Sequence, residues 1–169
     1  DYLYDFLLED GGTRFASLSA VDLPARMGVL QEMLLHPDTV TGLSDAGAHV
    51  TLICDGSMPT TQLAYWTRDR EKGEKIPIEY IVRKQTALNA QLYGFDDRGT
   101  LEQGKKADVN VIDMDNLRVS PPLPHHDLPT GGTRLMQPVT GYINTLCNGI
   151  SAREFDHDTG ERPGRLVRS

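Results

Sequence analysis

The sequence lacks the features that mark membrane-bound or disulfide-stabilised proteins. Its 169 residues contain only two cysteines, Cys54 and Cys147, and they do not form a C-x-x-C pair. Isolated cysteines of this kind are typical of reduced thiols in a protein interior, so the sequence predicts a cytoplasmic protein. No apolar run approaches the roughly 20 residues that a membrane span requires. The first residues carry no basic segment or cleavage pattern of a secretory signal, and because the chain does not start with methionine we expect it to begin partway through a longer protein.

Positive charge is also scarce. The chain has 17 Lys and Arg against 24 Asp and Glu, a net charge of −7, and the acidic excess is concentrated in residues 1–50. Without a basic stripe, a nucleic-acid-binding surface is not expected. A phosphate-binding loop is missing as well, because Gly131–Gly132 lacks the lysine and hydroxyl residue that such a loop needs. The composition, 38% hydrophobic and 24% charged, is that of an ordinary globular protein.

One short segment contains candidate catalytic residues: GLSDAGAHV, residues 42–50. β-branched and apolar residues flank it on both sides, and it contains one aspartate, Asp45, and one histidine, His49. Asp45 falls where a buried strand is predicted to end, and strand ends are where α/β folds keep their catalytic residues. Alternatively, Asp45 caps a turn or short helix and His49 is an ordinary, partly buried histidine. The pattern alone leaves both interpretations open.

Hydrophobic periodicity divides the chain into two unlike parts, residues 1–98 and 99–169. The first part predicts mainly helices, with a strand–helix–strand unit of a parallel sheet near its start. Its predicted elements are a helix over 2–9, a strand over 14–21, a helix over 22–36, a strand over 39–45, and helices over 60–73 and 78–94. The second part predicts short antiparallel strands, 107–115 and a hairpin over 141–155, whose Asn148–Gly149 pair is a strong turn signal.

These residues resemble a known family, the metal-dependent amidohydrolases. The stretch DRGTLEQGKKADV is similar to a marker found throughout that superfamily. DAGAHV and the run HDLPTGGTRLMQPVTGYINTLCNG resemble the N-acyl-D-amino-acid deacylase (D-aminoacylase) branch more specifically. The resemblance extends over almost the whole chain.

The resemblance implies a fold of class α/β plus β. Residues 1–98 would be the last βα units of a (β/α)₈ TIM-like barrel, with 14–21 as strand seven and 39–45 as strand eight. Residues 99–169 would supply the C-terminal strands of a small β-sandwich. The two parts found from periodicity match this layout.

The resemblance also implies a chemistry. Asp45 matches the aspartate that ends the last barrel strand, a general base that takes a proton from a metal-bound water and passes it to the amide nitrogen. It could also be a weak metal ligand. His49 stands where dihydroorotase-like relatives have a histidine that contacts the substrate carboxylate. The implied substrate is an N-acyl-D-amino acid, and the implied cofactor is one or two zinc ions.

The chain departs from the family in one respect. The superfamily's first metal ligands are an H-x-H pair, and none of the five histidines forms one. A catalytic zinc needs three or four converging ligands, so we expect this chain alone to be metal-free and inactive, with its missing parts supplied by the rest of the enzyme or a second copy. Two other functions stay open: a dihydropyrimidinase- or dihydroorotase-like hydrolase of cyclic amides, and a non-catalytic interaction module derived from the fold.

Overall fold

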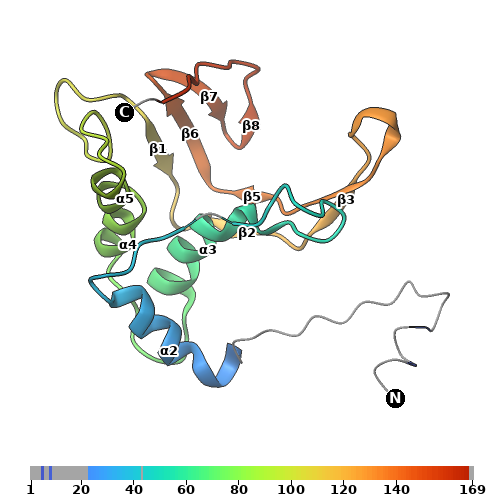
Figure 1. Ribbon diagram of the computed structural model, residues 1–169, viewed down its shortest axis with the longest axis horizontal. Helices are drawn as coiled ribbons and strands as arrows, with labels where there is room; N and C mark the ends of the chain where they lie inside the picture. Colours follow the sequence, from blue (N-terminus) through green and yellow to red (C-terminus); the bar gives the residue numbers. More distant parts are fainter. Residues whose placement is uncertain (1–4, 6–7, 9–22, 43, 168–169) are drawn as a thin grey trace. The chain divides into compact units, whose positions relative to one another are not determined.

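The computed structural model describes residues 5, 8, 23–42 and 44–167, and the chain divides into two units, Asp1–Thr39 and Val40–Ser169 (Figure 1). Each unit is considered by itself. The predicted helix 2–9, apart from residues 5 and 8, and the predicted strand 14–21 lie outside the described residues. The predicted boundary between residues 98 and 99 falls inside the second unit, where helices give way to strands.

The main described element of the first unit is the helix α2, Leu23–Leu35, which confirms the helix predicted over 22–36. Pro24 fits the first turn because the amide hydrogen it lacks would have no intrahelical partner there. The helix ends before His36 because Pro37 disfavours helical backbone in the residue preceding it. The Thr39 hydroxyl then donates to the carbonyl oxygen of Met33 at 2.6 Å, which satisfies one acceptor of the last turn.

The described part of the second unit begins with turns and then forms five helical segments before its first strand. A short 3₁₀ turn, η1, spans Asp55–Ser57; α3 spans Met58–Ala64; a π-helical turn, η2, spans Tyr65–Asp69. The helix predicted over 60–73 therefore starts two residues earlier and ends sooner. The helix predicted over 78–94 is two helices, α4 (Ile78–Gln85) and α5 (Ala87–Leu92). They are separated at Thr86, whose φ of −119° and ψ of −83° leave the helical region.

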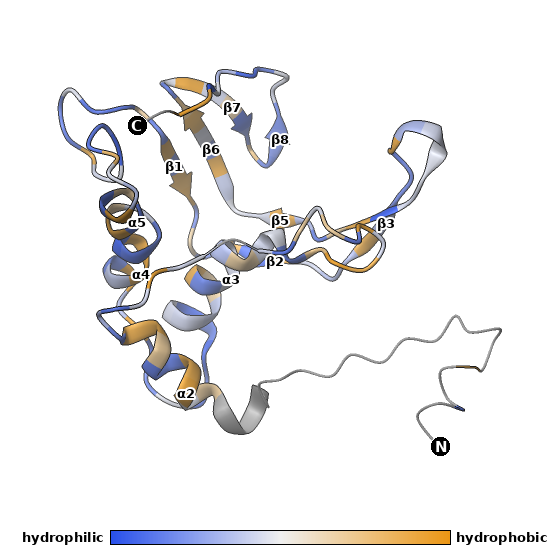
Figure 2. Cartoon of the chain, viewed as in Figure 1, coloured by the Kyte–Doolittle hydropathy of each residue, from blue (hydrophilic) through white to orange (hydrophobic). Residues whose placement is uncertain are grey.

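Antiparallel strands make up the rest of the second unit. A four-stranded sheet has the order β1-β6-β7-β8, from β1 (Val109–Ile112), β6 (Tyr142–Cys147), β7 (Ile150–Glu154) and β8 (His157–Asp158). Two two-stranded ribbons accompany it: β2 (Arg118–Val119) with β5 (Val139–Thr140), and β3 (Leu123–His125) with β4 (Arg134–Met136). A 3₁₀ turn, η3, spans Pro129–Gly131 between β3 and β4. Figure 2 shows hydrophobic residues on β1 and β6 and polar residues on β8.

The predicted hairpin over 141–155 is confirmed. β6 and β7 pair from Cys147 and Ile150, and the two residues between them have φ of +53° at Asn148 and +80° at Gly149. A two-residue turn with both φ values positive matches the right-handed twist of the strands it joins, and Asn-Gly adopts it at low cost. The strand predicted over 107–115 forms over its central residues as β1.

The strand predicted over 39–45 does not form in its described residues, and Thr51–Ile53 likewise lie in turns and coil. A strand exists only through a ladder of hydrogen bonds to a neighbour, and the predicted neighbour, 14–21, lies outside the described residues. All strand pairs within the described part of the chain are antiparallel.

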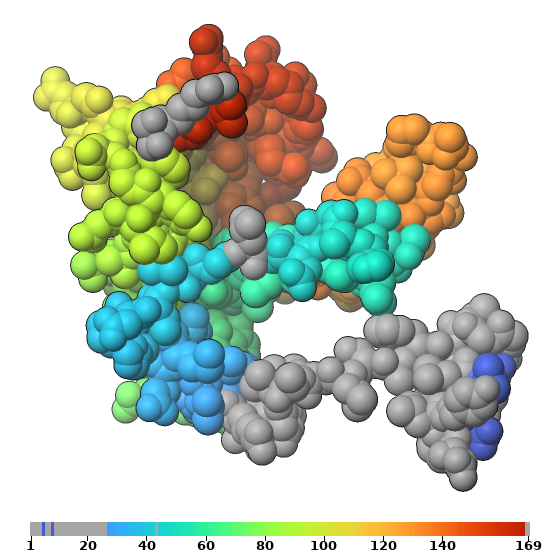
Figure 3. All heavy atoms as spheres, viewed as in Figure 1, coloured from blue at the N-terminus to red at the C-terminus, as the bar shows by residue number. Residues whose placement is uncertain are grey.

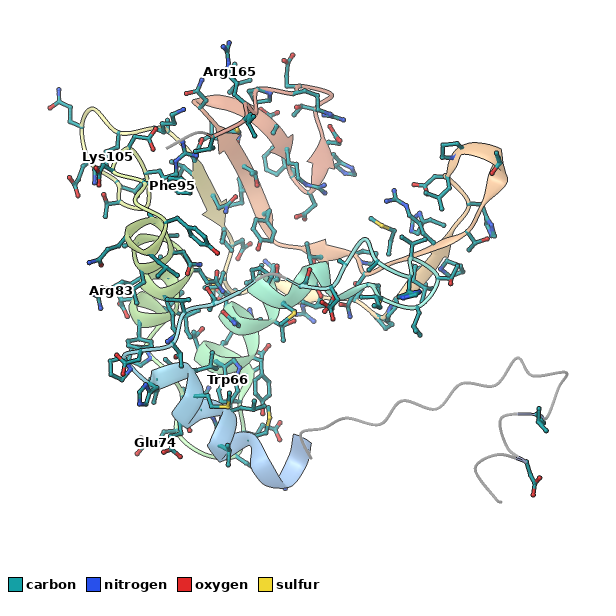
Figure 4. All side chains as sticks on the ribbon, in the orientation of Figure 1. Trp66, Glu74, Arg83, Phe95, Lys105 and Arg165 are labelled. Atoms are coloured by element: carbon teal, nitrogen blue, oxygen red, sulfur yellow. The ribbon has the colours of Figure 1, made fainter. Side chains whose placement is uncertain are left out.

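A small core lies between the helices and the first strands of the second unit. Its buried apolar residues are Leu63, Ala64, Trp66, Ile76, Ile81, Ala90 and Leu117. The Arg70 guanidinium, also buried, lies 4.6 Å from the centre of the Trp66 ring (labelled in Figure 4). Gly141, at φ +105°, lies so close to Leu117 that an added Cβ would be 2.7 Å from the Leu117 Cα atom. This position therefore requires glycine.

No helix in the described part of the chain combines the length and the apolar composition needed to cross a bilayer.

Candidate active site

The segment that contains Asp45 and His49 is a loop built from consecutive turns. The Ala48 amide donates to the Asp45 carbonyl oxygen at 3.1 Å, and the Leu52 and Ile53 amides donate to the His49 carbonyl oxygen at 2.7 and 3.0 Å. His49 itself has a φ of +45°, in the left-handed region. These local bonds occupy the backbone groups that a strand would have offered to neighbours, so the loop keeps its shape through its own turns.

The loop brings both predicted site residues to the surface. Asp45 and His49 are exposed, and no hydrogen bond or ion pair joins either side chain to another described residue. His49 is therefore not the partly buried histidine of the alternative interpretation. The carboxylate and the imidazole share one loop and are open to a reactant.

A second aspartate, Asp55, closes the base of this loop. Its Oδ2 atom accepts a hydrogen bond from the backbone amide of Asp45 at 3.3 Å. The two ends of the loop also touch, because a Cβ added at Gly56 would be 3.5 Å from the Ala46 Cβ. The Oδ1 atom of Asp55 is buried and has no partner among the described residues. Asp55 thus ties the loop to the start of the helical region.

Two buried polar contacts join that helical region to the strands. The Ser57 hydroxyl donates a hydrogen bond to the Oε1 atom of Gln137. One turn later, the Thr60 hydroxyl and the Tyr142 hydroxyl are 2.8 Å apart. Ser57 and Thr60 are both buried, and a buried hydroxyl is costly without a partner. These contacts hold the helix after Asp55 against the segment that leads into β6.

The ribbon β3–β4 lies beside the loop, as the adjoining orange and teal parts of Figure 3 show. The Leu135 amide donates to the Val50 carbonyl oxygen at 2.8 Å, which joins the two. Within the ribbon, the Arg134 guanidinium donates to both carboxylate oxygens of Asp127 at 2.7 and 2.6 Å. These hydrogen bonds lower the pKa of Asp127.

The superfamily-type motif around Arg98 joins α5 to the sheet. Arg98 donates to Asp97 at 2.8 Å and lies 5.4 Å from the centre of the Phe95 ring, which Figure 4 labels. Asp108 accepts the backbone amide of Asn148 at 2.7 Å, at the turn of the β6–β7 hairpin. These contacts are structural, so the motif explains how α5 and the sheet are connected and not which reaction occurs.

A pocket of about 520 Å³ lies beside this motif, at the end of α5 and the β6–β7 turn. Arg98, Lys106, Cys147 and Arg165 line it, together with three aspartates, so its positive and negative charges balance. No residue of the loop that holds Asp45 lines this pocket. The cavity and the candidate catalytic carboxylate are therefore separate features.

The described residues do not fit a complete metal centre. Within residues 23–42 and 44–167, no three His, Cys, Asp or Glu side chains converge in the way that a bound ion requires. Asp45 can contribute a single carboxylate at most, and a catalytic zinc needs three or more protein ligands. A metal at Asp45 would need ligands beyond this described set.

The sequence model of the Amidohydrolase family matches residues 17–149, which is most of the chain. The chain therefore belongs to the amidohydrolase family. This membership places it among the hydrolases of the amidohydrolase superfamily, which are usually metal-dependent. No curated protein and no solved structure matched it.

Sequence reasoning did not find Asp55, Ser57 or Gln137. Asp55 had a weak signal, since it stands beside Gly56 just after an apolar run and before a helix start. Ser57 and Gln137 had none, because their contact joins positions 80 residues apart.

Proposed function

We propose that this chain is the C-terminal part of an enzyme that hydrolyses a non-peptide amide C–N bond, with Asp45 as the proton-transferring residue. The observation that carries the proposal is the exposed, unpaired carboxylate of Asp45 on a loop fixed at its base by Asp55, in a chain of the amidohydrolase family. An ionised carboxylate within hydrogen-bond reach of a water can accept its proton.

The proposed reaction uses Asp45 twice. The carboxylate accepts a proton from the water whose oxygen attacks the amide carbon. The same proton then passes to the amide nitrogen as the C–N bond breaks, so that the products are a carboxylic acid and an amine and Asp45 is ionised again. A bound zinc would supply Lewis-acid chemistry, with ligands from outside the described residues.

The proposed substrate is an N-acyl-D-amino acid. His49 supports a substrate with a free carboxylate, because it is exposed four residues after Asp45 on the same loop. A protonated or hydrogen-bond-donating imidazole suits such a group. The alternative substrate is a cyclic amide such as a hydantoin or dihydroorotate.

Two measurements on the complete enzyme test this proposal. Asp45→Asn keeps the shape of the side chain but cannot accept a proton, so we expect turnover to fall by about 10²–10⁴-fold with the folded state retained. Near-normal kcat combined with lower stability would show that Asp45 only caps a turn. Activity on cyclic amides alone would refute the deacylase substrate.

We also propose that surfaces of this chain are covered by the rest of the enzyme or by a second copy. Leu123 and Met136 face each other across the β3–β4 ribbon, yet both are exposed. Exposed apolar pairs on a two-stranded ribbon are typical of surfaces that associate. Light scattering of the chain during size exclusion tests this, since a stable monomer that binds no hydrophobic dye would contradict it.

A further inference from the structure

Asp55 contacts the candidate catalytic residue through its backbone. The hydrogen bond from the Asp45 amide to Oδ2 of Asp55 joins two residues ten positions apart. It fixes the main chain at the point from which the Asp45 side chain extends. No other side chain in the described part of the second unit accepts a hydrogen bond from the Asp45 amide.

Asp55 is itself held in place. It is the first residue of the 3₁₀ turn η1, which ends at Ser57 and continues directly into α3. Ser57 is anchored to Gln137, and Thr60 in the following helix is anchored to Tyr142. The loop at 45–54 is mostly exposed and is held by its own turns and by the Leu135 amide at Val50, whereas Asp55 belongs to the packed helical region. The hydrogen bond from the Asp45 amide to Asp55 therefore holds this end of the loop in a fixed place relative to the packed helix.

The second oxygen of Asp55 indicates that the residue is not present for stability alone. Oδ1 is buried without a hydrogen-bond partner in the described residues. A buried carboxylate oxygen without a partner costs free energy, so its presence in a native fold calls for an explanation.

We infer that Asp55 is a positioning residue for Asp45 in the proposed hydrolysis, and this inference rests on the proposed function. A general base must lie about 2.6–3.2 Å from the atom whose proton it accepts. A displacement of about 1 Å can lower the rate about 10²-fold. Asp55 limits such displacement by holding the Asp45 amide, and it acts through Asp45 without touching the substrate.

The test compares two substitutions at Asp55 in the complete enzyme, assayed on whichever amide it hydrolyses. Asp55→Ala removes the acceptor, and we expect kcat to fall about 10–100-fold while KM changes less than about threefold. Asp55→Asn keeps an acceptor oxygen of the same shape, and we expect it to restore kcat to within about fivefold of the unsubstituted enzyme. Each rate is expressed per folded molecule, with the folded fraction taken from urea unfolding.

A matched control removes a carboxylate of similar local role elsewhere. Asp158 accepts the Gly160 amide at 2.7 Å in a turn of the sheet, and Asp158→Ala is expected to leave kcat unchanged. Normal kcat in folded Asp55→Ala, or equal losses in the alanine and asparagine variants, would overturn the inference. If Asp45→Asn retains normal kcat, the proposed function itself has failed, and the inference about Asp55 is overturned with it. These results separate the two failures.

Discussion

Replacing Gly141 by alanine tests how closely the backbone of β6 approaches the core. Gly141 precedes β6 with a φ of +105°, a conformation that residues with a Cβ rarely adopt. An added Cβ would lie 2.7 Å from the Leu117 Cα and 2.9 Å from the Leu117 nitrogen. Both are backbone atoms of a fully buried residue, so neither can move aside as a flexible side chain would.

Two costs add at this position. The unfavourable φ costs on the order of 1 kcal/mol for a residue with a Cβ. Forcing an extra carbon into a packed site costs about 1–3 kcal/mol more. We therefore expect Gly141→Ala to lower the free energy of unfolding by about 2–4 kcal/mol.

The matched control is Gly160→Ala, because Gly160 has a similar φ of +87° with nothing within 4 Å of an added Cβ. It should lose only the conformational cost, about 1 kcal/mol. Urea unfolding of both variants can be followed by the fluorescence of Trp66, the only tryptophan. All samples should have the same protein concentration, so that association contributes equally. A difference between the two variants below about 0.5 kcal/mol would refute the close-approach argument.

Three further predictions each follow from one local feature. Gly28 lies inside α2 with nothing within 4 Å of an added Cβ. Because alanine favours helix more than glycine does, Gly28→Ala should raise the free energy of unfolding by about 0.5–1 kcal/mol. A lower melting temperature would contradict this. Tyr142→Phe leaves the buried Thr60 hydroxyl without its partner and should cost about 1–3 kcal/mol in the same urea measurement, while a cost near zero would mean that water replaces the phenol. Arg134 lowers the pKa of Asp127 mainly by hydrogen bonding. The pair therefore stabilises the β3–β4 ribbon at pH values above the ordinary aspartate pKa of about 4. This stabilisation is lost as the pH falls through the lower pKa of the folded state. The protection of the ribbon amides, which is their exchange relative to the intrinsic rate at each pH, should therefore fall at acidic pH. Asp127→Asn should remove that fall.

Local sequence was enough for the elements whose stability is local. The Asn148–Gly149 turn has two residues with positive φ, which that pair adopts readily, and so the hairpin was predicted correctly. The end of α2 before Pro37 was likewise predictable, because proline restricts the residue before it. The motif residues from Asp97 onward were enough to predict the family, which the match over residues 17–149 confirms.

The break at Thr86 was not predicted, and the strand predicted over 39–45 does not form in its described residues. Apolar spacing does not show where a helix bends or whether a strand finds a partner.

Some residues of the candidate site could likewise be identified from the sequence, and others could not. Asp45 and His49 could be selected from sequence because they are the only ionisable residues in a short run of small and apolar ones. The role of Asp55 could not, because an aspartate near a glycine before a helix is equally typical of a turn or cap. Only the tertiary structure shows that its carboxylate meets the Asp45 amide, and that the helix behind it is anchored 80 residues away at Gln137. The physical reason is range: turn and helix signals act over a few neighbouring residues, whereas these contacts exist only once the helices have packed against the strands.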